Sequence, residues 1–158
     1  LSKISALPQM KVAWLLTNGP ENQVIPAMER LEVIADTYLS MNAPVQCAIP
    51  VLLEQRHAIQ RQLLERVQSN LAELDRQLES AKACQRLSLE GGWYAVLRVP
   101  VTRSDEELAI ELVREKSVLV HPGHFYDFPN DGYLVLSLIT VPDDFNAGIE
   151  RLLEFVGR

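Results

Sequence analysis

The most constraining feature of this sequence is a central stretch whose apolar residues recur every three, four or seven positions. The repeat comprises Leu52, Ile59, Leu63, Val67, Leu71, Leu74 and Leu78. This spacing places the apolar side chains on one face of an α-helix, while charged and amide residues fill the other face. The pattern predicts one long helix that is exposed along one side, with Pro50 at its start or at a kink. A helix of this kind is suited to linking two structural units.

The sequence before this helix predicts a strand and a second helix. Residues Met10 to Thr17 are apolar and end at the turn-forming sequence Asn18-Gly19-Pro20, which is typical of a buried strand. Apolar residues at helical spacing then predict a helix from about 24 to 40. Pro26 is compatible with that helix only in its first turn, where the missing N–H has no intrahelical partner.

After the long helix, the apolar period changes to that of a small sheet with helices. Strands are expected at residues 86–89, 93–99, 118–120 and 133–140. Ser104 followed by Glu107 forms a capping-box pattern that starts a helix, and a last helix is expected over residues 143–156. Residues His121 to Gly132 are expected to form a loop. The element order predicts an α/β fold with an α+β small domain.

These elements suggest three parts along the chain. Residues 1–45 are expected to complete a large domain that lies mostly upstream, residues 46–80 to form the linking helix, and residues 81–158 to form a small C-terminal domain. The first residues, Leu1-Ser2-Lys3-Ile4, contain no Met and run straight into ordered-looking sequence. We therefore expect the chain to be a fragment of a longer protein.

Composition argues against several classes of partner. The net charge of -6, without a basic stripe, disfavours nucleic acid as a partner of this portion. The longest apolar runs are far shorter than the roughly 20 residues of a bilayer span, and no signal-peptide pattern begins the chain. The two cysteines, Cys47 and Cys84, lie in predicted helices or helix ends, which favours a reducing compartment and hence the cytoplasm.

The first residues carry a motif that points to a family. Ser2-Lys3 is followed by Pro8 and then by Lys11-Val12-Ala13-Trp14. This segment resembles the cofactor-lysine segment of the fold-type I, class I/II aminotransferases, which depend on pyridoxal 5'-phosphate. In that family a basic residue follows the lysine after eight positions, and the offset from Lys3 to Lys11 matches this spacing.

Further matches to the same family follow in the family's order. They are Asn42-Ala43-Pro44-Val45-Gln46, Arg66-Val67-Gln68-Ser69-Asn70, Gly91-Gly92-Trp93-Tyr94 and Val120-His121-Pro122-Gly123-His124-Phe125. Each match is short, but together they extend the resemblance over nearly the whole chain. The resemblance implies the end of a large domain, a long interdomain helix and a C-terminal small domain.

The resemblance implies roles for three residues near the start of the chain. Lys3 is the expected catalytic residue, and Lys3, Lys11 and Ser2 are the expected cofactor-binding residues. A lysine amine must be neutral to add to the cofactor aldehyde, and once displaced by the substrate amine it serves as the base for the substrate Cα proton. Lys11 stands where the family usually has an arginine that binds the cofactor phosphate. A lysine retains the positive charge but lacks the planar guanidinium that can bind two phosphate oxygens at once.

The chain departs from the family in the strand Tyr133 to Leu138. The family places there the arginine that binds the substrate α-carboxylate, but this chain has Val135 at that position. Either another cation takes over, with Arg98 and His124 as candidates, or the substrate is not held in that way. Phe125 is a further candidate for substrate contact. His121 and His124 are interpreted as residues of a pocket-lining loop rather than as metal ligands, because no cluster at ligand spacing accompanies them.

The expected function of the intact protein is transfer of an amino group between an amino acid and a keto acid, with pyridoxal 5'-phosphate as cofactor. The amino donor and the keto-acid acceptor are its expected partners, a homodimer is its expected assembly, and this fragment alone is expected to be inactive. Two alternatives remain open. One is a fold-type I lyase or decarboxylase, which the missing arginine favours, and the other is the effector-binding domain of a transcription regulator.

Overall fold

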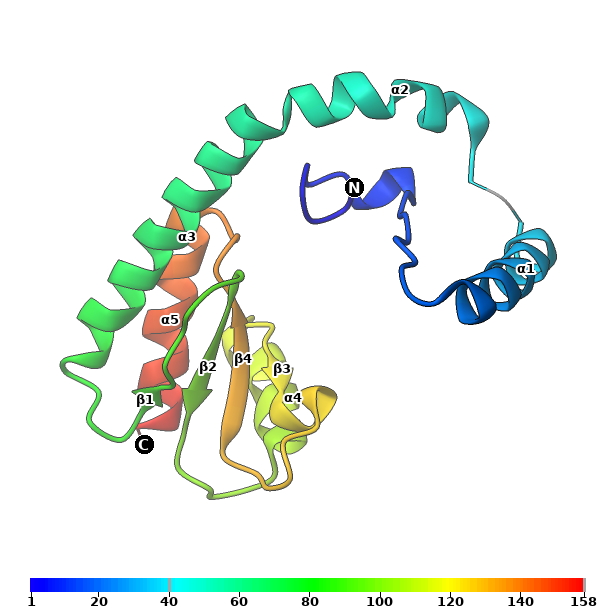
Figure 1. Ribbon diagram of the computed structural model, residues 1–158. Coiled ribbons are helices and arrows are strands. Elements are labelled where there is room, and N and C mark those ends of the chain that lie inside the picture. The colour runs from blue at the N-terminus through cyan, green and yellow to red at the C-terminus, as the bar shows by residue number, and fades with distance from the viewer. Residues whose placement is uncertain (40, 158) are drawn as a thin grey trace. The chain divides into compact units, whose positions relative to one another are not determined.

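The computed structural model describes residues 1–39 and 41–157, which divide into two units, Leu1–Gln62 and Leu63–Arg158. Figure 1 shows the elements in order along the chain. They are η1 (Pro8–Met10), α1 (Glu21–Thr37), α2 (Ala43–Glu54), α3 (Arg56–Leu78), β1 (Gln85–Arg86), β2 (Tyr94–Arg98), α4 (Asp105–Lys116), β3 (His121–Pro122), η2 (Gly123–Tyr126), β4 (Tyr133–Ser137) and α5 (Pro142–Val156). The mixture of helices with a small antiparallel sheet confirms the predicted α/β class.

The first unit contains helices but no strand among its described residues. The prediction of a buried strand from Met10 to Thr17 was wrong, since Met10 ends η1 and the residues after it have no regular structure. Trp14, Leu15 and Leu16 are 56%, 77% and 94% exposed. An apolar run becomes a strand only when a second strand pairs with its backbone, and the described residues of this unit provide none.

The predicted long helix is two helices. Helix α2 begins after Asn42, whose side chain accepts a hydrogen bond from the Val45 backbone N–H, and it ends at Glu54. Pro50 lies inside α2, so the break comes at Gln55 and not at the proline. The Arg56 guanidinium donates to the Leu53 carbonyl at 2.7 Å, which satisfies one of the acceptors freed where α2 ends. Helix α1 spans Glu21–Thr37, close to the predicted helix, but Pro26 lies beyond its first turn.

The second unit is an antiparallel sheet of four strands in the order β1-β2-β4-β3. One face of the sheet packs against α3, α4 and α5 and forms the apolar core (Figure 1). The sheet contributes Ala95, Leu97, Leu134 and Leu136 to this core, and the helices contribute Leu74, Leu108, Leu112, Phe145, Ile149 and Leu152. Side chains alternate between faces along a strand, so the residues between these four point to the opposite face.

Several predictions for this unit are confirmed, but of the strand expected at residues 86–89 only Arg86 lies in a strand, β1, and a second expected strand is absent. Ser104 caps α4 with Glu107 in a capping box, and the predicted helix over residues 143–156 is α5. The predicted strands at 93–99 and 133–140 correspond to β2 and β4. Residues 118–120, however, form no strand, and β3 is the pair His121–Pro122 within the predicted loop. Val118 and Val120 are buried without pairing, so burial of their side chains produced the strand-like pattern.

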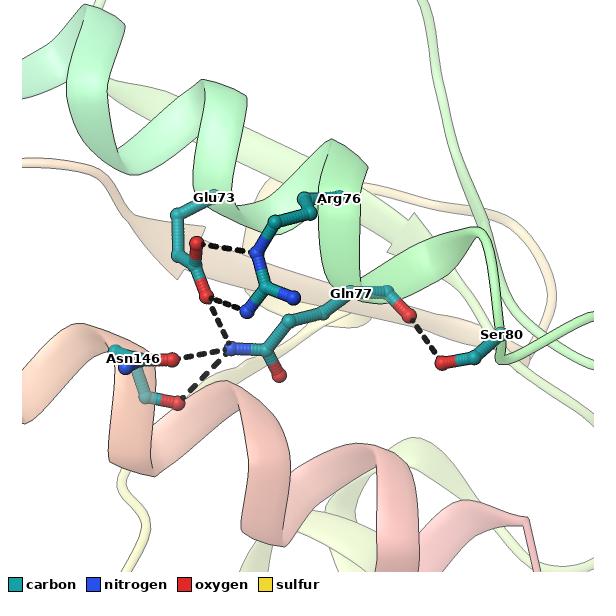
Figure 2. Close-up of polar contacts among 5 residues, drawn as sticks. All are labelled: Glu73, Arg76, Gln77, Ser80 and Asn146. Atoms are coloured by element: carbon teal, nitrogen blue, oxygen red, sulfur yellow. Dashed lines mark hydrogen bonds and ion pairs between the residues drawn. The ribbon is translucent and has the colours of Figure 1, made fainter.

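Helix α3 is joined to the rest of the second unit by amide side chains. The Asn70 side chain is buried, and its Nδ2 donates to the carbonyls of Leu138 at 2.9 Å and Thr140 at 2.8 Å. Farther along α3, the Gln77 Nε2 donates to the Asn146 backbone carbonyl and to its Oδ1 at 2.6 Å, which ties α3 to α5 (Figure 2). These bonds fix the helix relative to the end of β4.

Glu73 supports this contact between α3 and α5. Its carboxylate accepts hydrogen bonds from Arg76 and from the Gln77 Nε2 (Figure 2). The Arg76 hydrogen bond, followed by that of Gln77, lowers the pKa of Glu73 to about 2. The carboxylate therefore stays ionised near neutral pH and keeps the Gln77 amide directed at Asn146.

We expect Asn70→Ala to lower the free energy of unfolding by about 2 kcal/mol, because it leaves two carbonyls next to the core without their donor. Urea denaturation followed by circular dichroism measures the change. Gln68 lies two residues earlier on the exposed side of α3, so Gln68→Ala is the matched control and should change stability by less than about 0.5 kcal/mol. Equal effects of the two substitutions would show that Asn70 is not an anchor.

Candidate functional site

The first candidate region is the loop of residues 1–12 in the first unit. The Leu1 backbone nitrogen donates to the Val12 carbonyl at 2.8 Å, and both of these side chains are buried. Between them the chain turns through η1, and Lys11 ends this turn in the left-handed region with φ 52°. The loop is thus closed on itself, and it contains all three predicted cofactor residues.

Two of these residues line a shared surface. Ser2 and Lys3 line a shallow, open concavity of about 340 Å³ together with Val12 and Trp14. The Lys3 side chain is exposed, as an amine that meets a small molecule must be. Lys11 is also exposed but does not line this concavity, so its predicted contact with the cofactor phosphate stays a prediction.

The donors of this loop fit the groups of pyridoxal phosphate. Lys3 offers a primary amine for the aldehyde, and Lys11 offers a cation for the phosphate. Ser5, which sequence reasoning missed, is fully buried, and its Oγ has no hydrogen-bond partner among the described residues. A buried hydroxyl without a partner is rare in folded proteins, so the loop holds one donor that its own structure does not use.

The second candidate region is the face of the sheet that the helices leave uncovered in the second unit. The register pairs Tyr94 with Ser137, Val96 with Val135 and Arg98 with Tyr133, and residues paired across an antiparallel ladder share a face. On the other side of β4, His121 pairs with Val135. Tyr133, Val135 and Ser137 therefore share this face, and Arg98 belongs to it.

Val135 is at the centre of this face, between Val96 and His121. Its side chain is only 4% exposed, although it lies outside the core formed with the helices. A cavity of about 500 Å³ adjoins it, and Tyr94, His121, Val135 and Ser137 are among the residues that line this cavity. The position at which the resemblance predicts a carboxylate-binding arginine thus has an apolar neighbour on β2 and a polar one on β3.

Arg98 does not lie directly beside Val135. It is one ladder pair away, opposite Tyr133, and it lines a different concavity together with Lys82, Gln85 and Asp131. The Arg98 side chain is exposed, and Arg98 takes part in none of the ion pairs found among the described residues. A role for Arg98 in binding the substrate carboxylate stays a prediction, one that requires its side chain to extend along the sheet.

The segment containing His124 and Phe125 begins at Gly123, which lies close to the start of β4 and to a buried carboxylate. Asp105 is 2% exposed and accepts hydrogen bonds from the backbone N–H groups of Gly132 at 2.6 Å and Tyr133 at 3.1 Å. A Cβ at Gly123 would lie 2.9 Å from the Tyr133 Cβ and 3.0 Å from the Asp105 Oδ2, so the close approach requires glycine. This packing explains why the predicted loop has a glycine at position 123.

His124 and Phe125 belong to a group of aromatic rings next to the uncovered face. The two rings meet edge to face with centroids 4.8 Å apart, and Phe125 also lies 5.9 Å from the ring of His121. Phe125 is 65% exposed. Both residues can contact a ligand from this position, and their predicted role in substrate binding stays a prediction.

The described residues lack two other features that would indicate a function. Residues 1–39 and 41–157 contain no group of three or more His, Cys, Asp or Glu side chains that could hold a metal ion. Within the same residues, no helix is both long and apolar enough to cross a bilayer. Cys47 is exposed and Cys84 is buried, both are unpaired, and burial raises the pKa of the Cys84 thiol.

Known proteins similar to this chain are aminotransferases. The chain is 27% identical over 166 aligned residues to an alanine aminotransferase of Mycobacterium bovis, a match that covers 99% of this chain and 38% of that protein. A pyridoxal-phosphate-dependent aminotransferase from Streptococcus suis matches 98% of the chain and 39% of its own, with a TM-score of 0.82 and 22% identity. No family model matches the sequence.

The chain has the fold of the C-terminal part of these aminotransferases. This confirms the resemblance found in the sequence. A second similar structure, an α-aminoadipate aminotransferase from Thermus thermophilus, covers 83% of this chain and 35% of its own with a TM-score of 0.68 and 24% identity, and it is complexed with a phosphopyridoxyl-leucine compound. The chain thus spans about two fifths of the length of its relatives.

Sequence reasoning missed several residues of the candidate regions. The Ser5 hydroxyl left no sequence signal, because a serine in a loop is usually solvated. The grouping of Tyr94, His121 and Tyr126 was also missed, since it depends on the register between three strands and not on spacing within one segment. A separate role for Asp105 could have been suspected from the sequence. The first turn of α4 has three acidic residues, and the capping box uses only Glu107.

Proposed function

We propose that this chain is the C-terminal portion of a pyridoxal-phosphate-dependent aminotransferase that transfers an amino group between an amino acid and a keto acid. The observation that carries the proposal is the alignment of 99% of the chain with an alanine aminotransferase, and Lys3, at a concavity in the loop that resembles the family's cofactor-lysine segment, agrees with it. The small molecules of this reaction are the proposed partners. We further propose a homodimer in the cytoplasm.

Three residues of the first loop would hold the cofactor. Lys3 would bond to it through Nζ, Lys11 would supply positive charge to its phosphate, and Ser2 would add a hydroxyl donor. When bound, pyridoxal phosphate supplies an electron sink for the carbanion formed at the substrate Cα. Lys3 would then remove the Cα proton, and its exposed amine at the rim of the concavity suits a group that must reach the substrate.

Val135 supports a second candidate function. A bidentate arginine at this position orients the Cα of an amino acid, and this chain has an apolar, 4% exposed side chain there. A lyase or decarboxylase of the same fold, or an effector-binding domain without turnover, would not need that clamp. Product analysis separates these candidates, because only amino transfer converts an added keto acid into its amino acid.

The proposal is tested by comparing the full-length protein with the 158-residue chain, each supplied with pyridoxal phosphate, a panel of amino donors and a keto acid. We expect turnover from the full-length protein and none from the 158-residue chain, because the chain spans only 38% of its relative and the remainder of the cofactor site would come from elsewhere. Keto-acid formation by the short chain at enzymatic rates would contradict the division of the site. Absence of amino transfer by the full-length protein would contradict the proposed function.

A further inference from the structure

Three ring side chains meet next to Val135 on the uncovered face of the sheet, and we call Tyr94, His121 and Tyr126 the ring cluster. The His121 Nδ1 lies 2.9 Å from the Tyr126 hydroxyl, and these two rings stack with centroids 6.0 Å apart. Tyr94 and Tyr126 are also 6.0 Å apart. Because β2, β3 and η2 each contribute one ring, the cluster exists only in the folded sheet.

The strand register places the ring cluster beside Val135, the position at which the resemblance predicts an arginine. His121 is the ladder partner of Val135, and Tyr94 is the ladder partner of Ser137 on the same face. Tyr94 is 39% exposed and Tyr126 is 40% exposed, so a small molecule at this face can reach their hydroxyl groups. His121 and Tyr94 also line the cavity that adjoins Val135.

The ring cluster can offer a phenol O–H to an anion while its imidazole holds the phenols in place. A neutral imidazole protonated at Nδ1 donates to the Tyr126 oxygen, and Tyr126 also shares a hydrogen bond with Tyr94, so one phenol O–H of the pair is left to donate outward. Burial, followed by the interaction with Tyr94, raises the pKa of Tyr126, so this phenol keeps its proton. The three rings are neutral, and the cavity that adjoins Val135 is also lined by one carboxylate, Asp144, and one guanidinium, Arg151.

We propose that the ring cluster binds the carboxylate of the amino substrate through neutral hydrogen bonds, with Tyr126 as the specificity-determining donor and His121 as the residue that positions it. This inference rests on the proposed function, and it identifies the side chains that would bind the substrate carboxylate in place of an arginine. It explains how Val135 is compatible with an amino acid substrate, because hydrogen bonds from phenols stabilise a carboxylate without an ion pair. Arg98 is a less direct candidate, since its ladder partner is Tyr133 and it lines another concavity.

The test compares two amine ligands of the full-length, cofactor-loaded protein, neither of which can undergo amino transfer. 2-Methylalanine has no Cα proton to lose, and tert-butylamine is the same molecule with a methyl group in place of the carboxylate. Calorimetry gives the dissociation constant of each ligand. We expect Tyr126→Phe to weaken the binding of 2-methylalanine by roughly tenfold or more and to leave tert-butylamine unchanged, because a hydrogen bond to a charged group contributes more than a neutral one.

Tyr133→Phe is the matched control, because it removes a phenol hydroxyl from the same face outside the ring cluster, and it should change neither constant. The positioning role of His121 has a separate readout. His121→Leu should weaken 2-methylalanine severalfold, and His121→Asn, which retains a polar atom near the place of Nδ1, should recover most of the loss. Unchanged cofactor absorbance in each variant shows that the variant is folded.

Three outcomes would overturn the inference, and they are distinguishable from one another. Equal weakening of both ligands by Tyr126→Phe would show a structural role without carboxylate recognition. A dissociation constant for 2-methylalanine within twofold of the wild-type value would show that Tyr126 does not contact the carboxylate. Failure of the wild-type protein to bind pyridoxal phosphate would instead contradict the proposed function, and the inference with it.

Discussion

In the full-length protein, Lys3→Ala is expected to abolish the covalent attachment of pyridoxal phosphate and with it the reducible absorption band at the edge of the visible range. No other side chain of the loop carries an amine that lines the concavity with Ser2 and Trp14. Loss of the proton-transferring base alone lowers the rate by roughly 100- to 10,000-fold. Amino transfer should therefore fall at least to that extent, even where the cofactor still binds noncovalently.

Borohydride reduction followed by peptide mapping measures the attachment directly, because reduction makes the bond between the amine and the cofactor permanent. The label should appear on the peptide that contains Lys3. Lys82→Ala removes an exposed lysine of the second unit to which no role is assigned, and it should leave both label and activity unchanged. Label on any other lysine, Lys11 included, would refute the assignment.

The second unit was predicted well because its local signals agree with its tertiary structure. The capping box at Ser104 and Glu107 determines where α4 begins, and the alternation through Tyr133 to Ser137 matches a strand that is buried on the helix side. Each signal depends on residues a few positions apart, and the core formed within this unit satisfies it. Local preference and packing therefore give the same answer there.

The first unit was predicted poorly because its apolar residues have no packing partner within the described residues. Trp14 to Leu16 read as a buried strand, yet they are more than half exposed, and neither α1 nor α2 contains a buried residue. An apolar sequence pattern indicates that a segment is suited to burial, but it does not say which residues bury it. The helix break at Gln55 was missed for a different reason. No Gly or Pro lies at the break, and the apolar residues of α2 and α3 follow one continuous helical spacing.

The candidate site shows the same division between local and long-range information. Lys3 and Val135 were predicted as site positions because each belongs to a short motif with fixed spacing. The ring cluster was not found as a unit, because Tyr94, His121 and Tyr126 come together only through the pairing of β2 and β3 with β4. Register between strands cannot be read from one strand alone. The structure therefore adds the neighbours of Val135 to what the motif alone identified.

We expect Val135→Arg in the full-length protein to increase the preference for L-alanine over ethylamine, its carboxylate-free counterpart, by roughly tenfold to a hundredfold. A guanidinium at this position would give the carboxylate two charge-assisted hydrogen bonds, each stronger than one from a phenol. The methylene groups of an arginine can lie against Val96 while its charged end reaches the polar edge of the face. The ratio of kcat/KM for the two amines measures the change.

Val135→Leu is the matched control, because it enlarges the side chain without adding a donor, and it should leave the ratio of kcat/KM within about threefold of the wild-type value. Combining Val135→Arg with Tyr126→Phe separates the two modes of recognition, since an arginine that binds the carboxylate makes the phenol dispensable. The double variant should then retain most of the gain in preference. If Val135→Arg folds, binds the cofactor and leaves the preference unchanged, the uncovered face of the sheet does not contact the substrate carboxylate.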